Sequence, residues 1–247
     1  ALGADVLEIW TDVDGFMTAD PRVIPTARLI PEMTFIESME LCTFGAKVIY
    51  PPTIYPVFHK NIPIKIRNTF RPESACTLIT DHAPSRQTPV TGISSLKATA
   101  LIRLRGKVCN NVAGINTRSF NVLTRQGISV YLVGQRNEDN EFSFALSNAD
   151  ASVAKSLLRE EFAPELSSGE LTEIAVSEGL STIAVVGENL RLLEGIDTRI
   201  LNSLIADGVT PIASSGSNSK TTATFVVVEE QTRHAIELIH SIFFPSE

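Results

Sequence analysis

Residues 114–135 read GINTRSFNVLTRQGISVYLVGQ, and this stretch decides the fold. Its first half carries a mostly apolar face at helical spacing, made by Ile115, Ser119, Phe120 and Leu123. Gly127 stands where a helix favours a terminating residue with positive φ. Residues 128–133 are apolar and rich in β-branched side chains, as strands are. The stretch therefore predicts a helix, a turn and a strand, in that order.

The helix is expected to begin just after Gly114, which would end the preceding loop. Asn116 or Thr117 would then cap the helix, because a short polar side chain satisfies an amide that the first turn leaves without a partner. Gly114 itself lies outside the helix in this prediction.

The same unit occurs a second time at a displacement of 81 residues, which carries Gly114 to Gly195 and Gly127 to Gly208. Strand-like segments flank both copies at that displacement, at residues 100–106, 141–146, 181–187 and 222–227. The second half of the chain is therefore expected to hold two copies of one strand–helix–strand–strand–helix unit. A two-copy repeat favours a pair of similar domains, because a solenoid needs at least three repeats.

A second helix is expected to close each copy, over residues 148–162 and 230–243. The inward side chains of the first are predicted to be Val153, Leu157 and Leu158. Those of the second are predicted to be Ala235, Ile236, Ile239, Ile242 and Phe243.

The composition excludes several classes of protein. The chain has 247 residues, 43% of them hydrophobic, which is enough for two or three small packed domains. A net charge of −7 and a pI near 5.2 argue against a nucleic-acid surface. No apolar run approaches the length of a membrane span, and no G-x-G-x-x-G motif is present for a dinucleotide.

The cysteines and histidines indicate no metal site. Cys42, Cys76 and Cys109 are odd in number and widely spaced, which suits a reducing, cytoplasmic setting. The four histidines do not cluster, so surface or helix-packing roles are expected for them.

The N-terminal third opens abruptly. Ala1 is not a methionine, and residues 6–10 already resemble a buried strand, so we expect the natural protein to continue in the N-terminal direction; a processed terminus is the alternative. Two acidic turns follow, TDVDG at residues 11–15 and TADPR at residues 18–22. Ligands bind at the carboxyl ends of strands in α/β proteins, but on spacing alone plain turn chemistry explains both motifs better.

Further along, Thr34 and Glu37 form a capping box that opens a helix to about Cys42. Residues 44–47, FGAK, place a lysine after a turn, where it could reach an anion. A helix to about Lys60, a strand over 62–67 and a turn-rich tail over 71–77 are expected next. Residues 81–89, DHAPSRQTP, indicate a linker.

The motifs WTDVDG at residues 10–15, TADPR at 18–22 and FGAKV at 44–48 together resemble aspartokinase, and the repeats resemble its pair of amino-acid-binding ACT domains. The resemblance implies a mixed α/β and α+β chain: the C-terminal part of an amino-acid-kinase domain followed by two βαββαβ, ferredoxin-like ACT domains. The kinase part would be residues 1–86, the first ACT domain 98–172, and the second 88–97 with 173–247. The repeats are most similar to those of the aspartokinase–homoserine dehydrogenase type.

The resemblance also implies a nucleotide site. ATP with Mg²⁺ would be the substrate, held near Thr11, Asp12, Met17, Arg22 and Lys47. Lysine and arginine supply donors for phosphate oxygens. Met17 stands where the family often has tyrosine. No catalytic residue or metal ligand is expected in this part of the enzyme, so the fragment alone should be inactive.

For the regulatory half, the resemblance implies an amino-acid effector site facing a partner module, often across a dimer. Its residues would be Val112, Ala113, Gly114, Ser129, Val130, Tyr131 and Gln135. A helix N-terminus can hold the effector's carboxylate, and the Gln135 amide suits a hydroxyl, which favours threonine over lysine. The second copy has Gly216 in place of Gln135 and could serve only as a packing partner.

These implications leave alternatives. A homodimer or higher homo-oligomer through the ACT domains is expected. A free-standing amino-acid-sensing module without catalytic role is the rival from another class, but it would have no use for the motifs in residues 11–22 and 44–48. A lysine-responsive monofunctional aspartokinase is a further alternative.

Overall fold

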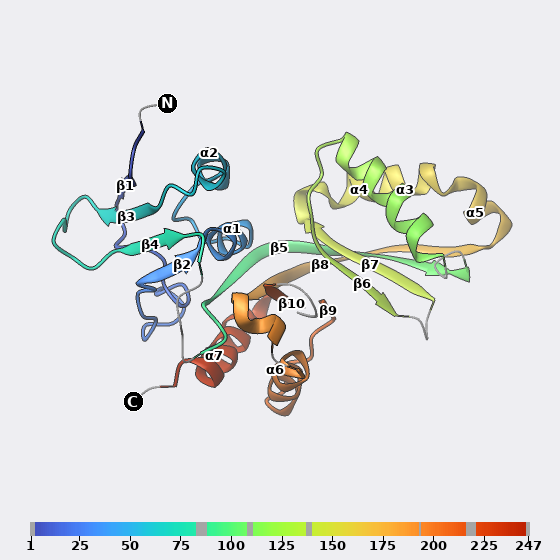
Figure 1. The fold of residues 1–247 in the computed structure, drawn as a ribbon. Coiled ribbons are helices and arrows are strands. Elements are labelled where there is room, and N and C mark those ends of the chain that lie inside the picture. Colours follow the sequence, from blue (N-terminus) through green and yellow to red (C-terminus); the bar gives the residue numbers. More distant parts are fainter. Residues whose placement is uncertain are drawn as a thin grey trace.

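The computed structural model describes residues 3–82, 88–107, 111–136, 140–192, 194–215 and 221–245. Two β-sheets organise these residues, a four-stranded sheet near the N-terminus and a six-stranded sheet that spans the rest (Figure 1). Residues 3–82 are called the N-terminal segment below. Among the described residues, no helix combines the length and apolar character needed to cross a membrane.

The N-terminal sheet has the strand order β1-β3-β4-β2. β1 (Leu7–Thr11) pairs in parallel with β3 (Ile64–Asn68), and β2 (Glu32–Thr34) pairs in parallel with β4 (Thr77–Thr80). The expectation of a buried first strand is wrong: β1 alternates between half-buried and exposed residues. Among the described strands it lies at the edge of the sheet, beside β3. β4 was not predicted, because its four residues follow a segment of turn-forming side chains.

Two helices accompany this sheet, α1 (Phe35–Thr43) and the short α2 (Tyr55–Phe58), which follows a 3₁₀ turn over Pro51–Thr53. The predicted capping box is confirmed at the start of α1. The Thr34 hydroxyl accepts the Glu37 amide at 3.2 Å, and the Glu37 carboxylate accepts the Thr34 amide at 2.9 Å. The second helix is shorter than expected.

The six-stranded sheet has the order β6-β7-β5-β8-β10-β9. Two long antiparallel strands at its centre run through both halves, β5 (Gly92–Gly106) and β8 (Leu171–Val186). The other strands are β6 (Val130–Arg136), β7 (Glu141–Ser147), β9 (Ala213–Ser215) and β10 (Thr222–Val228).

The helices of this region are α3 (Val112–Arg125), α4 (Ala151–Glu161), α5 (Ala163–Ser168), α6 (Ile196–Ala206) and α7 (Thr232–Phe243). Short 3₁₀ turns cover Asn148–Asp150, Glu188–Leu192 and Glu229–Gln231. Val153 is exposed, against expectation, because α4 turns Ala151, Ala154 and Leu158 toward the sheet.

The long strands divide between two βαββαβ units. The first module is α3, β6, β7, α4 and α5 with residues 99–106 of β5 and 171–177 of β8; β5 there pairs with β7 on one side and β8 on the other. The second module is α6, β9, β10 and α7 with residues 92–96 of β5 and 180–186 of β8. The second module therefore takes its last strand from a segment that precedes the first module in the chain.

An irregularity separates the modules on both long strands. Ala98 in β5 has φ of 52°, and Gly179 in β8 has φ of 70°. The strand register shifts between Leu96 and Thr99 and again between Thr99 and Leu101. The left-handed backbone region is costly for a residue with a Cβ, so Ala98 marks a strained point between the modules.

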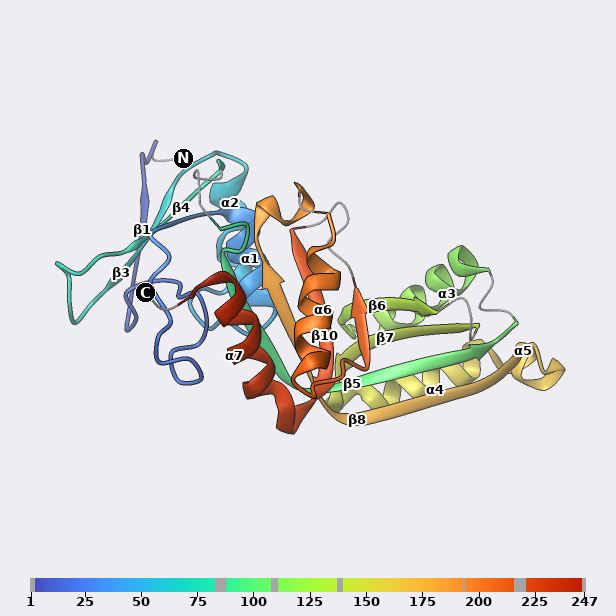
Figure 2. The same cartoon turned by 90° about the horizontal axis from the view of Figure 1, so that it is seen from below.

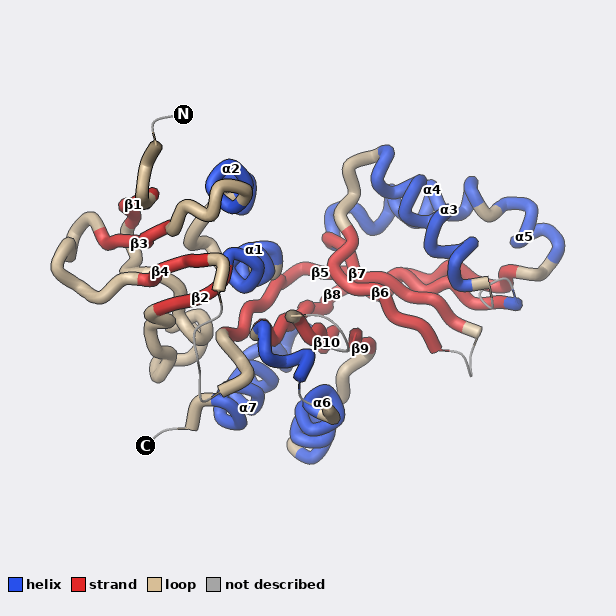
Figure 3. The backbone as a smooth tube through the Cα atoms, viewed as in Figure 1, coloured by secondary structure: helices blue, strands red, loops and turns tan. Residues whose placement is uncertain are grey.

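The helices of the two modules cover opposite faces of the continuous sheet. Figures 1 and 3 show α3, α4 and α5 above it and α6 and α7 below it, and Figure 2 shows the lower face with α6 and α7 in front. On the upper face of the second module lies α1 of the N-terminal segment, where Ala184 and Val186 of β8 join a core with Phe35 and Leu41. The second module is thus covered on both faces.

Candidate functional site

The loop after β1 carries the first predicted nucleotide residues. Thr11 ends β1, and its hydroxyl donates to the carboxylate of the exposed Asp12 at 3.1 Å. Neither side chain is buried, so both can meet a ligand at the end of the strand.

Asp14 in the same loop holds the neighbouring loop in place. Its carboxylate accepts hydrogen bonds from the Asn68 amide at 2.8 Å, the Arg71 guanidinium at 2.8 Å and the Ser74 hydroxyl at 3.0 Å. Asp14 was not among the predicted site residues. Its three donors lie more than fifty positions further along the chain, so no local pattern could have indicated this role.

Gly15 allows the close approach that closes this loop. With φ of 155°, a Cβ at this position would lie 2.1 Å from the Thr77 hydroxyl oxygen. That hydroxyl accepts the Phe16 amide at 2.9 Å and donates to the Ile30 carbonyl at 2.7 Å. The loop that follows β1 is therefore fixed against β4.

Arg22 is exposed and forms an ion pair with Asp20. Its Nε lies 3.0 Å from Asp20 Oδ1 and its Nη2 lies 2.7 Å from Asp20 Oδ2. These hydrogen bonds lower the pKa of the Asp20 carboxyl group. Met17, half-buried, forms a lone β-bridge with Leu29.

Lys47 is exposed on the turn that follows α1. Gly45, two residues earlier, approaches β5 so closely that a Cβ there would lie 2.5 Å from the Ser95 carbonyl oxygen. The Ser94 hydroxyl also donates to the Phe44 carbonyl at 2.8 Å. Among the contacts of the described residues, no hydrogen bond or ion pair joins Lys47 to Thr11, Asp12 or Arg22.

The predicted start of the first module's helix is wrong, because the cap was expected at Asn116 or Thr117 and lies five or six residues earlier. α3 begins at Val112, and Asn111 caps it, with its side-chain oxygen accepting the Gly114 amide at 3.2 Å. Val112, Ala113 and Gly114 are therefore the first helical turn and not a loop. The Gly114 amide therefore already donates to Asn111. The start of α3 is still the positive end of the helix dipole.

The structure does not bring the two halves of the predicted effector site together within one chain. Residues 112–114 lie at the start of α3, and Ser129, Val130 and Tyr131 follow its end. The 14 residues of α3 span about 21 Å. Gln135 lies at the far end of β6, where its backbone is opposite Phe142. Gly216 lies outside the described residues.

The segment 129–131 instead borders the N-terminal segment. A cavity of about 700 Å³ is lined there by Thr43 of α1, by Phe120, Thr124 and Gly127 of the α3 region, and by residues 128–131. Tyr131 packs against the core of the N-terminal segment, and burial, together with the charge of Asp150, raises the pKa of its hydroxyl. Residues predicted for the effector site and the N-terminal segment therefore touch at this point.

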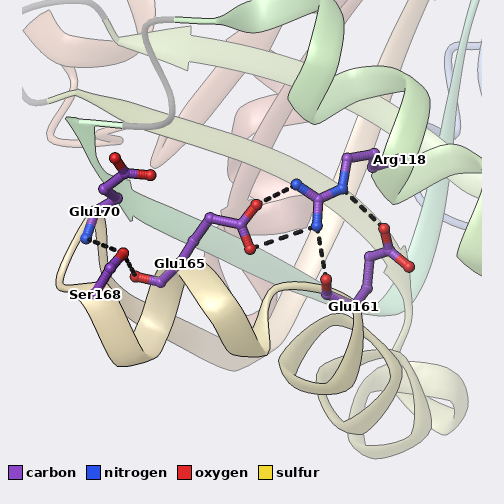
Figure 4. A network of polar contacts seen from close by, with 5 residues as sticks. All are labelled: Arg118, Glu161, Glu165, Ser168 and Glu170. Atoms are coloured by element: carbon purple, nitrogen blue, oxygen red, sulfur yellow. Dashed lines mark hydrogen bonds and ion pairs between the residues drawn. The ribbon is translucent and has the colours of Figure 1, made fainter.

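Arg118, in the repeated GINTR motif, ties the helices of the first module together (Figure 4). It donates to Glu161 and Glu165, and its guanidinium lies 4.3 Å from the centre of the Phe162 ring. The ion pair lowers the pKa of Glu165. At the same displacement of 81 residues, Arg199 lies over Phe243, at 5.9 Å, in the second module.

Glu37 of α1 connects the N-terminal segment to the second module. It is 1% exposed, and its Oε1 accepts the Thr91 hydroxyl at 2.5 Å and the Glu188 amide at 3.0 Å. Nearby, the Thr222 hydroxyl of β10 donates to Glu40 at 2.9 Å. These contacts link α1 of the N-terminal segment to the residue before β5, to the 3₁₀ turn at Glu188 and to β10 of the second module.

A metal centre is not apparent. Within the described ranges, no group of three or more His, Cys, Asp and Glu side chains could hold a metal ion.

Comparisons with known proteins agree with this arrangement. Residues 1–68 match the amino acid kinase family. The bifunctional aspartokinase/homoserine dehydrogenase of Haemophilus influenzae is 37% identical over 98% of this chain and 30% of its own length. This chain therefore spans about a third of that relative.

Solved structures extend the likeness to the fold. An aspartate kinase from Clostridium acetobutylicum superposes with a TM-score of 0.84 at 25% identity, over 97% of this chain and 55% of that one. E. coli aspartokinase III, in complex with aspartate and ADP, superposes with a TM-score of 0.78 at 27% identity, over 97% of this chain and 52% of that one. The complex of the same enzyme with lysine and aspartate superposes with a TM-score of 0.76 at 27% identity, over 98% of this chain and 53% of that one.

The N-terminal segment is thus part of an amino-acid-kinase domain, and the six-stranded sheet is a pair of ACT domains. By motif, sequence and fold, the chain belongs to the aspartokinase family, and its sequence matches part of relatives of the aspartokinase–homoserine dehydrogenase type.

Proposed function

We propose that this chain belongs to a longer aspartate kinase, which transfers the γ-phosphoryl group of MgATP to the side-chain carboxylate of L-aspartate. The observation that carries this proposal is the joint match of the kinase segment and both ACT modules to enzymes of that name over nearly the whole chain. E. coli aspartokinase III was solved with aspartate and ADP, which supports both substrates. The domain boundaries proposed are 1–86 for the kinase part, 98–172 for the first ACT domain, and 88–97 with 173–247 for the second.

In this proposal, residues 11–22 and Lys47 contact the nucleotide. The ion pair with Asp20 uses the Nε–H of Arg22 and an N–H at Nη2. A guanidinium has five N–H donors, so Arg22 retains donors for a phosphate oxygen while Asp20 fixes its orientation. Lys47 adds a mobile positive charge. Phosphoryl transfer depends mainly on such positioning and charge stabilisation.

The experiment is a coupled assay of the longer polypeptide with aspartate and MgATP, beside the 247-residue chain alone. We expect aspartate-dependent ADP formation from the longer polypeptide and none from the chain alone. Absence of turnover from the longer polypeptide would favour the alternative, a regulatory module without catalytic role. Turnover from the chain alone would contradict its proposed status as a fragment.

For the regulatory half, we propose that the first module binds threonine and that two copies of the chain complete the site. The two parts of the proposed site lie at opposite ends of α3, so one effector cannot contact both within a single chain. β6 is an edge strand whose free backbone groups suit pairing with a second copy. A homodimer through the first modules is therefore proposed, and monomers in light scattering at millimolar concentration would contradict it.

Lysine is the second candidate, because E. coli aspartokinase III was solved with lysine. Calorimetry on the chain separates the two. We expect threonine to bind more tightly, and Gln135→Ala to weaken it by roughly 3- to 30-fold, as for one or two lost hydrogen bonds. Gly216→Ala, the matched change in the second module, should leave affinity unchanged. Tighter lysine binding, or an unaltered threonine affinity in Gln135→Ala, would remove this assignment.

A further inference from the structure

One buried contact joins the last helix of the second module to the loop that carries Arg22. The Thr18 hydroxyl lies 3.0 Å from Nε2 of His240, which is 222 positions further along the chain. Thr18 is 6% exposed and His240 is 4% exposed. A surface or helix-packing role was expected for His240.

Thr18 is fixed from three directions. Its carbonyl accepts the Ile93 amide of β5 at 2.8 Å, and its amide donates to the Arg28 carbonyl at 2.8 Å. Its hydroxyl accepts the Arg28 amide at 3.0 Å. A hydroxyl has one proton to donate, so that proton remains for His240 Nε2 when the imidazole is neutral.

The surroundings of His240 favour the neutral imidazole. Burial, together with the nearby positive charge of Arg28, lowers the pKa of His240. The ring packs on Phe244 with a centroid distance of 4.8 Å. Glu237, the acidic side chain beside it on the wall of the adjoining cavity, pairs with Arg233 at 2.9 Å.

The loop beyond Thr18 is held by short-range backbone contacts, because the Asp20 carbonyl accepts the Val23 and Ile24 amides at 2.9 Å. Arg22 is exposed, and its side chain pairs with Asp20, two residues away in the same loop. The position of this ion pair therefore depends on the buried residues that precede and follow it, Thr18 and Ile24. Ile24 packs into the core of the second module, as does Ala19.

We propose that His240 is a positioning residue for nucleotide binding: through its hydrogen bond to Thr18, α7 of the second ACT module holds the Asp20–Arg22 loop in its binding position. This proposal rests on the nucleotide role proposed above for Arg22. It gives the second module a task that needs no effector of its own, because movement of α7 would move the loop.

The test measures MgADP binding to the longer polypeptide by calorimetry in three variants. His240→Leu removes the hydrogen bond, and His240→Gln keeps a polar atom near the position of Nε2. His234→Leu is the matched control, because His234 is exposed on the same helix. We expect about three- to tenfold weaker binding in His240→Leu, as for one buried hydrogen bond. His240→Gln should restore affinity to within about twofold, and His234→Leu should not alter it.

A second measurement uses the 247-residue chain, so that a folding failure of one variant does not decide the question. The ¹⁵N NMR signals of His240 should show a neutral ring with its proton on Nδ1, and Thr18→Val should shift the Nε2 signal while Thr18→Ser should not. A folded His240→Leu protein with unaltered MgADP affinity, absence of rescue by glutamine, or a protonated Nε2 would each overturn the proposal. Tight MgADP binding without aspartate turnover would contradict the proposed kinase reaction but not this role of His240.

Discussion

The two ACT modules share a fold and a repeated sequence, but their surroundings differ. The main core of the first module is built from residues of that module, and a smaller cluster on the other face of its sheet joins Leu101, Leu132 and Ala145 to Leu180 and Val226 of the second module. The core of the second also contains Ala19 and Ile24 of the N-terminal segment, and its β8 residues Ala184 and Val186 belong to the kinase-side core. One repeat unit can thus serve as an accessible sensor in one copy and as a structural support in the other.

The polar contacts follow the same division. In the first module, Arg118 binds two carboxylates of its own module, Glu161 and Glu165. In the second module, the position that matches Glu161 is Ile242, and polar contacts go instead to the N-terminal segment, from Thr222 to Glu40 and from His240 to Thr18. The first copy therefore stabilises itself, and the second stabilises its contact with the kinase part.

The largest effect is expected where the second module meets α1. Glu37→Ala should lower the free energy of unfolding by about 3 kcal/mol or more, because it removes the carboxylate that accepts from the buried Thr91 hydroxyl and the half-buried Glu188 amide. Denaturant unfolding measures this change. Glu160→Ala, at an exposed position of the first module, is the control, and an equal loss in both variants would remove the distinction between the modules.

A smaller effect is expected from the repeated arginine. Arg118→Met should cost about 1–3 kcal/mol, because it breaks charge-assisted hydrogen bonds to Glu161 and Glu165. Arg199→Met should cost less than about 1 kcal/mol, since Arg199 retains only a distant contact with the Phe243 ring among the ring contacts described. The two variants are compared in the same urea titration. A larger loss for Arg199→Met would show that the second copy depends on this motif more than the first.

Substitutions at the junction between the modules should change stability in opposite directions on β5 and β8. Ala98→Gly should raise stability by up to about 1 kcal/mol, because glycine tolerates the φ of 52°. Gly179→Ala should lower stability by about 1–2 kcal/mol, since φ is 70° and no atom crowds the new Cβ. Thermal unfolding checks both. Changes of equal sign would show that this backbone geometry does not limit stability.

The smallest effect concerns pH. The pKa of Glu165 is lowered in the folded chain by Arg118, so this pair stabilises the fold above the ordinary carboxylate pKa. That contribution is lost as the pH falls below the ordinary value and through the lowered one. The free energy of unfolding should therefore fall more steeply between pH 7 and pH 3 in the unsubstituted chain than in Arg118→Met. Identical pH profiles would mean that the pair contributes nothing.

Local patterns in the sequence predicted most of the architecture. The repeat at a displacement of 81 residues indicated two similar units, and the capping box at Thr34 and Glu37 located α1. These features depend on neighbours within a few residues. The start of α3 was misplaced because short polar residues stand both before it and within its first turns, and only the structure shows that Asn111 is the cap.

Long-range contacts could not be predicted in the same way. The distant partners of Asp14, Glu37 and His240 lie between 54 and 222 positions away, and the local sequence around these three residues does not indicate those contacts. Tyr131 was expected in an effector site, but its packing against the kinase core depends on how the module sits on α1. The sequence indicated which residue types to consider for the candidate site. It did not indicate the contacts that join the second module to the N-terminal segment.

The most direct test of the account is native-state hydrogen exchange on the chain, with and without threonine. The account predicts that the Ile93 and Glu188 amides, which bond to Thr18 and Glu37, open together with β10 as one unit with the N-terminal segment. The amides of α3 and β6 should open separately, and threonine should slow their exchange first. If the Ile93 and Glu188 amides exchanged independently of β10, or opened together with α3, the division of roles between the two modules would be contradicted.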